Sequence, residues 1–272
     1  CAFYDFGLDA AAGALMAAQQ RGVRVRVVSD TDHAGRPAMQ ACVRAGIPVV
    51  HDDRSAYMHN KFCVADARFV WTGSTNITDN GLYRNNNNAV RIDSEALAAN
   101  YLAEFEEMFA GRHFGPQSPE NTPHARLEVG AVDVRCFFAP EDDAEEAILA
   151  AVGDARREIV FMAFAFTSTP IAEAMAARMG AGVRVRGLFE ARNAGSRYSR
   201  DDYLRERGAE VHMDDNSKSM HHKSIIVDGR TVITGSYNFS RSAEESNDEN
   251  LLIFDAPKLA AVYVEEFAAL TN

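Results

Sequence analysis

Basic residues are scarce in this chain of 272 residues. Lys and Arg number 28 against 39 Asp and Glu, so the formal net charge at pH 7 is −11. Nucleic-acid binding relies on Lys and Arg to neutralise phosphates, so this charge counts against a nucleic-acid partner, although a local basic cleft could outweigh it. Uninterrupted apolar runs also stay short of the ~18 residues that a membrane-spanning helix needs. The sequence therefore predicts no transmembrane segment.

Cysteines are also few, and they follow no recognisable pattern. The four of them show neither C-x-x-C spacing nor the Cys/His spacing of a metal site: Cys1, Cys42, Cys63 and Cys136. We interpret them as small buried hydrophobic residues. No cluster of carboxylates is visible in the sequence either. We therefore expect neither a metal nor another cofactor.

What the chain does contain is a hairpin rich in chemically active side chains. A strand carries His221 and Lys223 into the Asp228-Gly229 turn, and a second strand returns from it. Positions i and i+2 of a strand share a face, so His221 and Lys223 point the same way. With a two-residue turn, His221 lies opposite Ser236 and Lys223 opposite Thr234. This face would gather an imidazole, an ammonium and hydroxyls, the groups needed to hold and attack an anionic ester.

The same pattern lies 162 residues earlier in the chain. His59 and Lys61 precede Asp66, as His221 and Lys223 precede Asp228. Further on, Gly73-Ser74-Thr75-Asn76 corresponds to Gly235-Ser236-Tyr237-Asn238 at the same offset. A constant offset over several positions indicates an internal repeat.

These residues resemble the phospholipase D superfamily, whose mark is His-x-Lys-x-x-x-x-Asp followed by Gly-Ser-x-Asn. Both copies match at every position, and the resemblance extends over nearly the whole chain. The second half is also similar to bacterial phospholipase D-type endonucleases. The resemblance implies one active site between two homologous domains that face each other across a pseudo-twofold axis. Strands that alternate with helices, twice over, favour the α/β class independently.

The domain boundaries follow from the repeat and from a Pro-punctuated stretch. We expect an N-terminal phospholipase D-like domain over residues 1–115, a linker over 116–128 and a C-terminal phospholipase D-like domain over 129–272.

The first repeat begins abruptly. Cys1-Ala2-Phe3 aligns with Met162-Ala163-Phe164, and residues 132–161 of the second half have no counterpart in the first. We interpret the natural protein as having an N-terminal strand-helix-strand that is absent from this chain. A mature lipoprotein that begins at Cys1 is the alternative, although it leaves the first repeat incomplete. The sequence thus leaves the compartment open, with an extracytoplasmic bacterial location among the alternatives.

By the resemblance, His59 is the nucleophile that forms a phosphohistidine, and His221 is the general acid and then the base. Lys61 and Lys223 would stabilise the charge that builds on the phosphate oxygens. The same supporting role is expected of four other polar side chains: Ser74, Asn76, Ser236 and Asn238. This chemistry requires no metal.

Three acidic residues lie near the two motifs. Asp66 and Asp228 each occupy a turn seven residues after a histidine, and we interpret them as structural. Glu249 is the candidate to orient a histidine, because related nucleases carry a glutamate 28 residues after theirs. In the first copy the corresponding residue is Asn87. We therefore expect the two histidines to have different partners.

Three functions fit the pattern to different degrees. It favours a phosphodiester hydrolase that acts on phospholipid head groups, with peripheral contact to a membrane. A nuclease is the alternative, and a basic groove between the domains would support it. An inactive scaffold is the third, but both copies retain His and Lys. We expect a monomer with a pseudo-dimeric active site, and the sequence does not distinguish hydrolysis from transfer to an alcohol.

Overall fold

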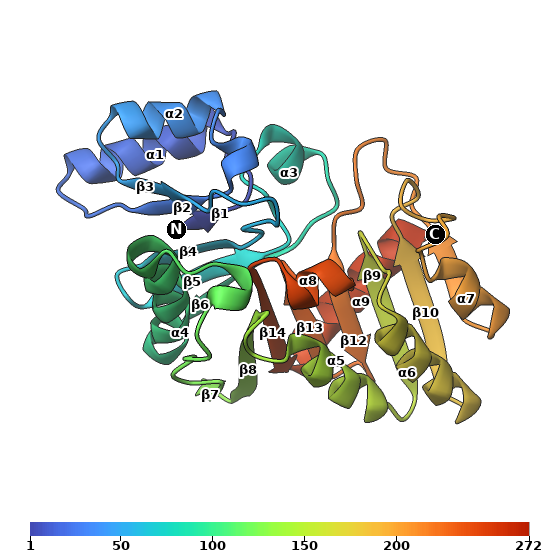
Figure 1. Ribbon diagram of the computed structural model, residues 1–272. Coiled ribbons are helices and arrows are strands. Elements are labelled where there is room, and N and C mark those ends of the chain that lie inside the picture. The colour runs from blue at the N-terminus through green and yellow to red at the C-terminus, as the bar shows by residue number, and fades with distance from the viewer. Residues whose placement is uncertain (272) are drawn as a thin grey trace.

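The computed structural model describes residues 1–271, which form two α/β units, each built on its own sheet (Figure 1). The first sheet has the order β3-β2-β1-β4-β5-β6, in which β1 to β3 are parallel and the later strands antiparallel. Its strands are β1 (Ala2–Phe3), β2 (Val27–Ser29), β3 (Val49–His51), β4 (Lys61–Ala65), β5 (Phe69–Gly73) and β6 (Ala89–Asp93).

The second sheet repeats this order and adds two strands. Its order is β11-β10-β9-β12-β13-β14-β8-β7, so β8 and β7 extend the sheet beyond β14. The strands are β7 (Arg126–Val129), β8 (Val132–Ala139), β9 (Glu158–Ala163), β10 (Arg184–Phe189), β11 (Glu210–Met213), β12 (Lys223–Val227), β13 (Thr231–Gly235) and β14 (Glu249–Asp255). The predicted α/β class with two homologous units is confirmed. Residues 126–128 of the expected linker belong to this sheet.

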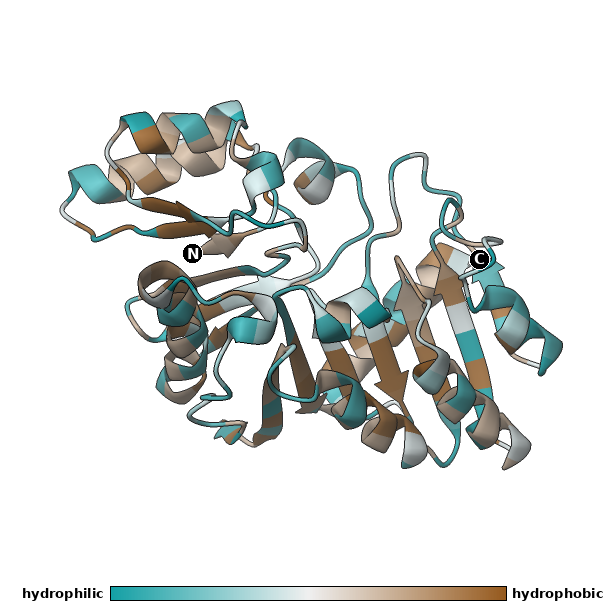
Figure 2. Cartoon of the chain, viewed as in Figure 1, coloured by the Kyte–Doolittle hydropathy of each residue, from teal (hydrophilic) through white to brown (hydrophobic). Residues whose placement is uncertain are grey.

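Helices cover both faces of each sheet, and central strands such as β9 and β12 are predominantly hydrophobic and buried (Figure 2). The outer layers are formed by α1 (Asp9–Gln20) and α2 (Pro37–Arg44) in the first unit and by α5 (Ala144–Gly153), α6 (Thr169–Gly180) and α7 (Asp201–Glu206) in the second. Two helices, α4 (Glu95–Glu106) and α9 (Pro257–Thr271), contribute to a core that contains side chains of both sheets. This shared core joins the two units.

Short helical segments complete the chain. They are η1 (Thr31–His33), α3 (Asp79–Tyr83), the π-helical turn η2 (Glu107–Gly111), η3 (Gly115–Gln117) and α8 (Arg241–Glu245). The helices α3 and α8 follow the two hairpins and are again related by 162 residues. Among residues 1–271, we find no helix with the length and apolarity to cross a bilayer.

The turn of the second hairpin has one more residue than expected. Val227 pairs with Thr231, which leaves Asp228, Gly229 and Arg230 in the turn. Asp228 and Gly229 both have positive φ angles, of 54° and 62°. Arg230 is the extra residue, of the kind that forms a bulge next to a tight turn. The first hairpin has the same register.

This extra residue corrects the predicted cross-strand pairs. His221 was expected opposite Ser236 and Lys223 opposite Thr234, but Thr234 pairs with Ser224 instead. A shift of one residue moves a side chain to the opposite face of the sheet. Thr234 is therefore not part of the face that carries the histidine and the lysine.

The strand β1 also corrects the alignment of the two repeats. Phe3 lies opposite Lys61 as Ala163 lies opposite Lys223. The first three residues therefore correspond to residues 161–163, one position earlier than predicted from the sequence.

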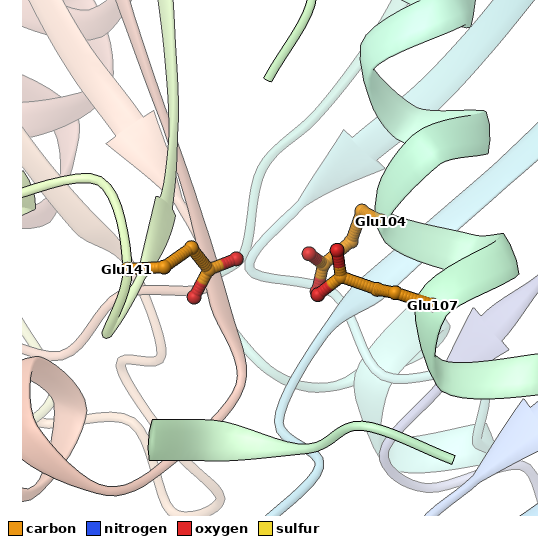
Figure 3. A group of neighbouring side chains, drawn as sticks. All are labelled: Glu104, Glu107 and Glu141. Atoms are coloured by element: carbon orange, nitrogen blue, oxygen red, sulfur yellow. The ribbon is translucent and has the colours of Figure 1, made fainter. Parts of the chain in front are cut away.

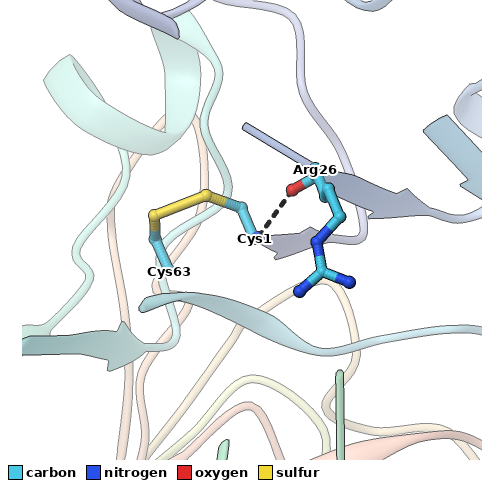
Figure 4. The surroundings of a disulfide bond; sticks show 3 residues. All are labelled: Cys1, Arg26 and Cys63. Atoms are coloured by element: carbon cyan, nitrogen blue, oxygen red, sulfur yellow. Dashed lines mark hydrogen bonds between the residues drawn. A yellow bond between two sulfur atoms is a disulfide. The ribbon is translucent and has the colours of Figure 1, made fainter. Parts of the chain in front are cut away.

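Two of the four cysteines form a disulfide, which corrects the interpretation of all four as small buried hydrophobic residues. Cys1 is bonded to Cys63 of β4, and its amino group donates to the carbonyl oxygen of Arg26 at 2.9 Å (Figure 4). Cys42 and Cys136 are buried and free, as predicted. The spacing of 62 residues gives no hint of the link, because the pairing of β1 with β4 creates it.

Candidate active site

Each candidate histidine follows a residue that bridges to the other unit. A parallel bridge joins Met58 to Asp248, and its counterpart 162 residues away joins Met220 to Asn86. In both bridges the backbone N–H of the following histidine donates to the bridged residue's carbonyl, at 2.9 and 2.8 Å. The two bridges thus repeat each other across the pseudo-twofold. As a result, the residue that follows Asp248 lies against His59, and the residue that follows Asn86 lies against His221.

For His59 this next residue is Glu249. Nδ1 of His59 lies 2.8 Å from Oε2 of Glu249, and both side chains are buried. Ser236 donates its hydroxyl proton to the same oxygen at 2.6 Å. Glu249 lies 28 residues after His221, yet it contacts the histidine of the other unit. When the Nδ1 proton is shared with this carboxylate, the lone pair of Nε2 is left available to attack an electrophile.

For His221 the corresponding residue is Asn87. Nδ1 of His221 lies 3.0 Å from Oδ1 of Asn87 and 3.0 Å from the carbonyl oxygen of Ser74. Asn87 donates its amide to the carbonyl of Gly81 at 2.6 Å, which turns Oδ1 toward the ring. Both neighbours of Nδ1 are acceptors, so Nδ1 carries the proton. The two histidines therefore have different partners, a carboxylate for one and neutral oxygens for the other.

The two lysines are almost completely buried beside the histidines, each 1% exposed. Nζ of Lys61 donates to the carbonyl of His59 at 2.6 Å. Nζ of Lys223 donates to the carbonyl of His221 at 3.1 Å and lies 3.2 Å from its Nε2. All four predicted catalytic side chains thus lie in one buried site between the units.

Two aromatic rings, which were not predicted from the sequence, pack against the histidines and lysines of the site. Tyr4 packs edge-on against His59, with centroids 4.7 Å apart, and Nζ of Lys61 lies 4.9 Å from the Tyr4 ring. Phe164 stands in the same relation to the second unit, 4.6 Å from its histidine and 4.9 Å from its lysine. Each ring is the residue directly after a central parallel strand, and that position was the available signal.

Burial shifts every ionisable group of the site toward its neutral form. It lowers the pKa of His59 and of His221 well below the usual value, and the nearby lysines add to this effect. It lowers the pKa of Lys61 to about 7 and that of Lys223 well below its usual range. Burial also raises the pKa of Glu249 to about 8, although both lysines oppose the shift. An anion bound between the lysines would restore their charge, so the site is suited to a phosphate.

The four predicted supporting residues fall into two pairs. The hydroxyls of Ser74 and Ser236 accept hydrogen bonds from the main chain at 3.1 and 3.0 Å, so they hold the cross-bridging segments in place. Within residues 1–271, the side-chain carbonyl oxygens of Asn76 and Asn238 are buried without a hydrogen-bond partner. The two pairs therefore differ: the serine hydroxyls are engaged by the main chain, whereas each asparagine keeps a free acceptor.

The glycine before each of these serines is required by packing. A Cβ on Gly235 would meet the carbonyl oxygen of Asn250 at 2.1 Å, and one on Gly73 would meet that of Asn88 at 2.4 Å. Only glycine lets the end of the hairpin approach the segment that carries Glu249 in one unit and Asn87 in the other.

The two motif aspartates differ in their contacts. Asp228 accepts hydrogen bonds from the backbone N–H groups of residues 156–158, at 2.7 to 2.9 Å. Burial opposes its ionisation, but these donors outweigh that effect and hold the pKa of Asp228 below its usual value. Asp66 occupies the equivalent turn of the first hairpin and is exposed. Among residues 1–271, neither aspartate pairs with a histidine, and the structural role of both stays a prediction.

Two other acidic residues support the histidines, and sequence reasoning missed them. Oδ2 of Asp30 accepts from the backbone N–H of Met58 at 3.0 Å, and Oε2 of Glu190 accepts from that of Met220 at 2.8 Å. Each directly follows a buried parallel strand, β2 or β10. An acidic residue at that position in both halves was the signal that could have found them.

The expectation that no carboxylates cluster is wrong. Glu104, Glu107 and Glu141 meet between the two units, apart from the predicted site residues (Figure 3). Two of them lie in consecutive helical segments and the third follows β8, so only the packing of the units brings them together.

The sequence matches one protein-family model and is similar to several named proteins. The model of a family described as cardiolipin synthase, phospholipase D-like domain, matches residues 2–109 and 148–271. A mitochondrial cardiolipin hydrolase of Chlamydomonas reinhardtii is 31% identical over 135 residues, which are 50% of this chain and 60% of that protein. A phospholipase D of Rickettsia prowazekii is 26% identical over 163 residues, 60% of this chain and 80% of the relative.

A solved structure shares the whole architecture. The phosphatidylserine synthase of Haemophilus influenzae has a TM-score of 0.74, with 15% identity, over 100% of this chain and 80% of that one. This similarity concerns the fold alone. The matched regions span between 36% and 60% of the length of five mitochondrial cardiolipin hydrolases.

Proposed function

The chain belongs to the phospholipase D-like domain family, and we propose that it hydrolyses the phosphodiester bonds of phospholipids through a phosphohistidine on His59. The observation that carries this proposal is the pair of cross-unit contacts, His59 with Glu249 and His221 with Asn87. A carboxylate at Nδ1 increases the basicity of an imidazole, so His59 is the better nucleophile. His221, with neutral partners, is assigned the proton transfers.

The reaction then has two steps. Nε2 of His59 attacks phosphorus and the bond to the leaving oxygen breaks. His221, which the bound phosphate anion holds in its imidazolium form with a proton on each ring nitrogen, gives its Nε2 proton to that oxygen. Water next attacks the phosphohistidine and gives a proton to His221, and the P–N bond breaks to restore His59. Lys61 and Lys223 balance the negative charge that builds on the non-bridging oxygens in both steps.

A lipid substrate is supported by the names of the relatives, cardiolipin hydrolase and phospholipase D. The net charge of −11 disfavours nucleic acid as the substrate. Exposed apolar side chains, among them Tyr57, Leu82 and Tyr83, are suited to contact a membrane interface. We further propose that a single chain provides the complete site, since both histidines and both lysines come from it.

The experiment gives the protein cardiolipin vesicles, phosphatidylcholine vesicles, single-stranded DNA and bis(4-nitrophenyl) phosphate in parallel. His59→Ala is the inactive control, and His113→Ala, at an exposed position, is the matched active one. We expect phosphatidate release from a lipid, lost only in His59→Ala. Cleavage of DNA and not of lipid would overturn the substrate proposal, and no cleavage of any compound would overturn the chemistry.

A further inference from the structure

Three glutamates converge at the boundary between the two units (Figure 3). Glu104 lies on α4, Glu107 begins the π-helical turn, and Glu141 follows β8 of the other unit. One carboxylate oxygen from each lies within 4.8 Å of the others. Glu104 and Glu107 are only 2% and 7% exposed. Carboxylates gathered this closely away from water need either protons or a cation between them.

A separate observation is that all three glutamates have an unsatisfied oxygen. Oε2 of Glu104, Oε1 of Glu107 and Oε2 of Glu141 are buried and have no hydrogen-bond partner in the described part of the chain. Among the ion pairs of residues 1–271, none includes any of these glutamates. Buried polar atoms without partners are rare in folded proteins, and an ion is one of the groups that satisfies them.

The second oxygen of two of these carboxylates is held by an amide. Asn60 donates Nδ2 to Oε1 of Glu104 at 2.8 Å, and Asn121 donates Nδ2 to Oε2 of Glu107 at 3.0 Å. Each of these glutamates therefore has one oxygen fixed by a neighbour and the other left free. Ligating carboxylates in metal sites are commonly supported in this way.

We propose that Glu104, Glu107 and Glu141 bind one hard divalent cation of the size of calcium. The ligand set consists of oxygen alone, which calcium, magnesium and manganese prefer over softer metals. The carboxylate oxygens lie within 4.8 Å of one another, a span that calcium–oxygen bonds of about 2.3–2.6 Å can bridge. Magnesium dehydrates reluctantly and usually keeps several waters, so a buried site made of protein carboxylates suits calcium better.

The bound cation has a structural role. It joins α4 of the first unit to the loop after β8 of the second. Asn60, which supports Glu104, also accepts a hydrogen bond from Nδ2 of Asn250 at 2.8 Å. Asn60 and Asn250 directly follow His59 and Glu249 in the chain. The cation therefore strengthens the contact between units that holds this catalytic pair together, without taking part in the reaction.

The test measures binding and stability, which do not depend on substrate. The protein is stripped with EDTA and dialysed, then titrated with CaCl₂, MgCl₂ and MnCl₂ by calorimetry and by thermal unfolding at constant ionic strength. We expect calcium to bind once per chain and to raise the melting temperature by roughly 5 °C at 100 times its dissociation constant. Magnesium should have a smaller effect.

Glu104→Gln and Glu141→Gln should each remove the calcium-dependent rise, while Glu120→Gln, at an exposed position of the neighbouring loop, should retain it. In EDTA, Glu141→Gln should melt at or above the wild-type temperature, because it removes one of three clustered carboxylates. That result also shows that the variant folds. The proposal is overturned if no cation changes the melting temperature, or if the glutamine variants respond like the wild type; the glutamates then share protons instead.

Discussion

The two histidines of this protein occupy equivalent positions but have different partners. His59 faces the buried carboxylate of Glu249, whereas His221 faces the neutral oxygens of Asn87 and Ser74. The backbone around them is nearly symmetric, with the same bridge between the units on both sides. A single position in each repeat therefore breaks the symmetry. Under the proposed mechanism, this one difference assigns two roles to the same side chain in a duplicated unit.

The two units also differ where the first carries its disulfide. Cys1 and Cys63 occupy the places of Phe161 and Ile225, which face each other across β9 and β12. Phe161 and Ile225 are fully buried in the core of the second unit that packs against α5, α6 and α7. The second unit thus has an apolar contact where the first unit has a disulfide. The two repeats thus differ in a stabilising contact as well as in the partners of their histidines.

The largest difference between the two histidines is expected when each is removed in turn. His59→Ala should lower the turnover of any phosphodiester by at least ~10⁴-fold, because no intermediate forms. His221→Ala should cost ~10²–10⁴-fold on a lipid but far less in the first step on bis(4-nitrophenyl) phosphate, whose leaving group needs no acid. Single-turnover release of nitrophenolate measures that step. A burst that survives in His59→Ala and vanishes in His221→Ala would reverse the roles.

Replacing the carboxylate makes the two histidines more alike. Burial raises the pKa of Glu249 to about 8, so its carboxylate is ionised mainly above that pH. Glu249→Gln removes this carboxylate, and we expect kcat/KM measured above pH ~8 to fall by ~10²–10⁴-fold, as when the carboxylate of a catalytic triad is neutralised. Glu120→Gln is the matched control, with no expected change. Steady-state kinetics on bis(4-nitrophenyl) phosphate provides the measurement. A loss of less than threefold would mean that Glu249 does not activate His59.

The reverse change gives His221 a carboxylate. Asn87→Asp places a negative charge near Nδ1, and this favours the imidazolium form, so the pKa of His221 rises. A general acid with a higher pKa stays protonated at higher pH, so the alkaline limb of the pH–rate profile should move up by about one unit. Asn85→Asp is the control in the same polar run. An unchanged alkaline limb would contradict the assignment of His221 as the acid.

The smallest effects are expected from replacing the two turn aspartates, and these effects concern stability. The two substitutions compare equivalent turns of the two units. Asp228→Asn weakens three hydrogen bonds to a charged acceptor and should lower the free energy of unfolding by about 1 kcal/mol. Asp66→Asn should change it by less than ~0.5 kcal/mol, as for an ordinary surface substitution. Asparagine tolerates the positive φ angle at both positions. Urea unfolding measures the difference, and equal effects would contradict it.

Much of the site could be predicted because the repeat keeps its spacing. The histidines, lysines and turn aspartates follow from local sequence, and the structure places them as the motif suggests. The partner of each histidine could not be derived in this way, since the bridges at Met58 and Met220 cross between units. The glutamate cluster was missed for the same reason. The disulfide was missed because the pairing of β1 with β4 within the first unit creates it. The predicted register of the hairpin strands was wrong by one position, because the bulge residue Arg230 has no distinct sequence signal.

The most direct test locates the phosphoryl group during turnover. His221→Ala would be mixed with bis(4-nitrophenyl) phosphate, quenched in alkali, where phosphohistidine is stable, digested and mapped by mass spectrometry. Without its general base the variant should accumulate the intermediate, and the phosphoryl group should lie on His59. A modified histidine at another position, or nitrophenolate release without any modified histidine, would contradict the assignment of His59 as the nucleophile.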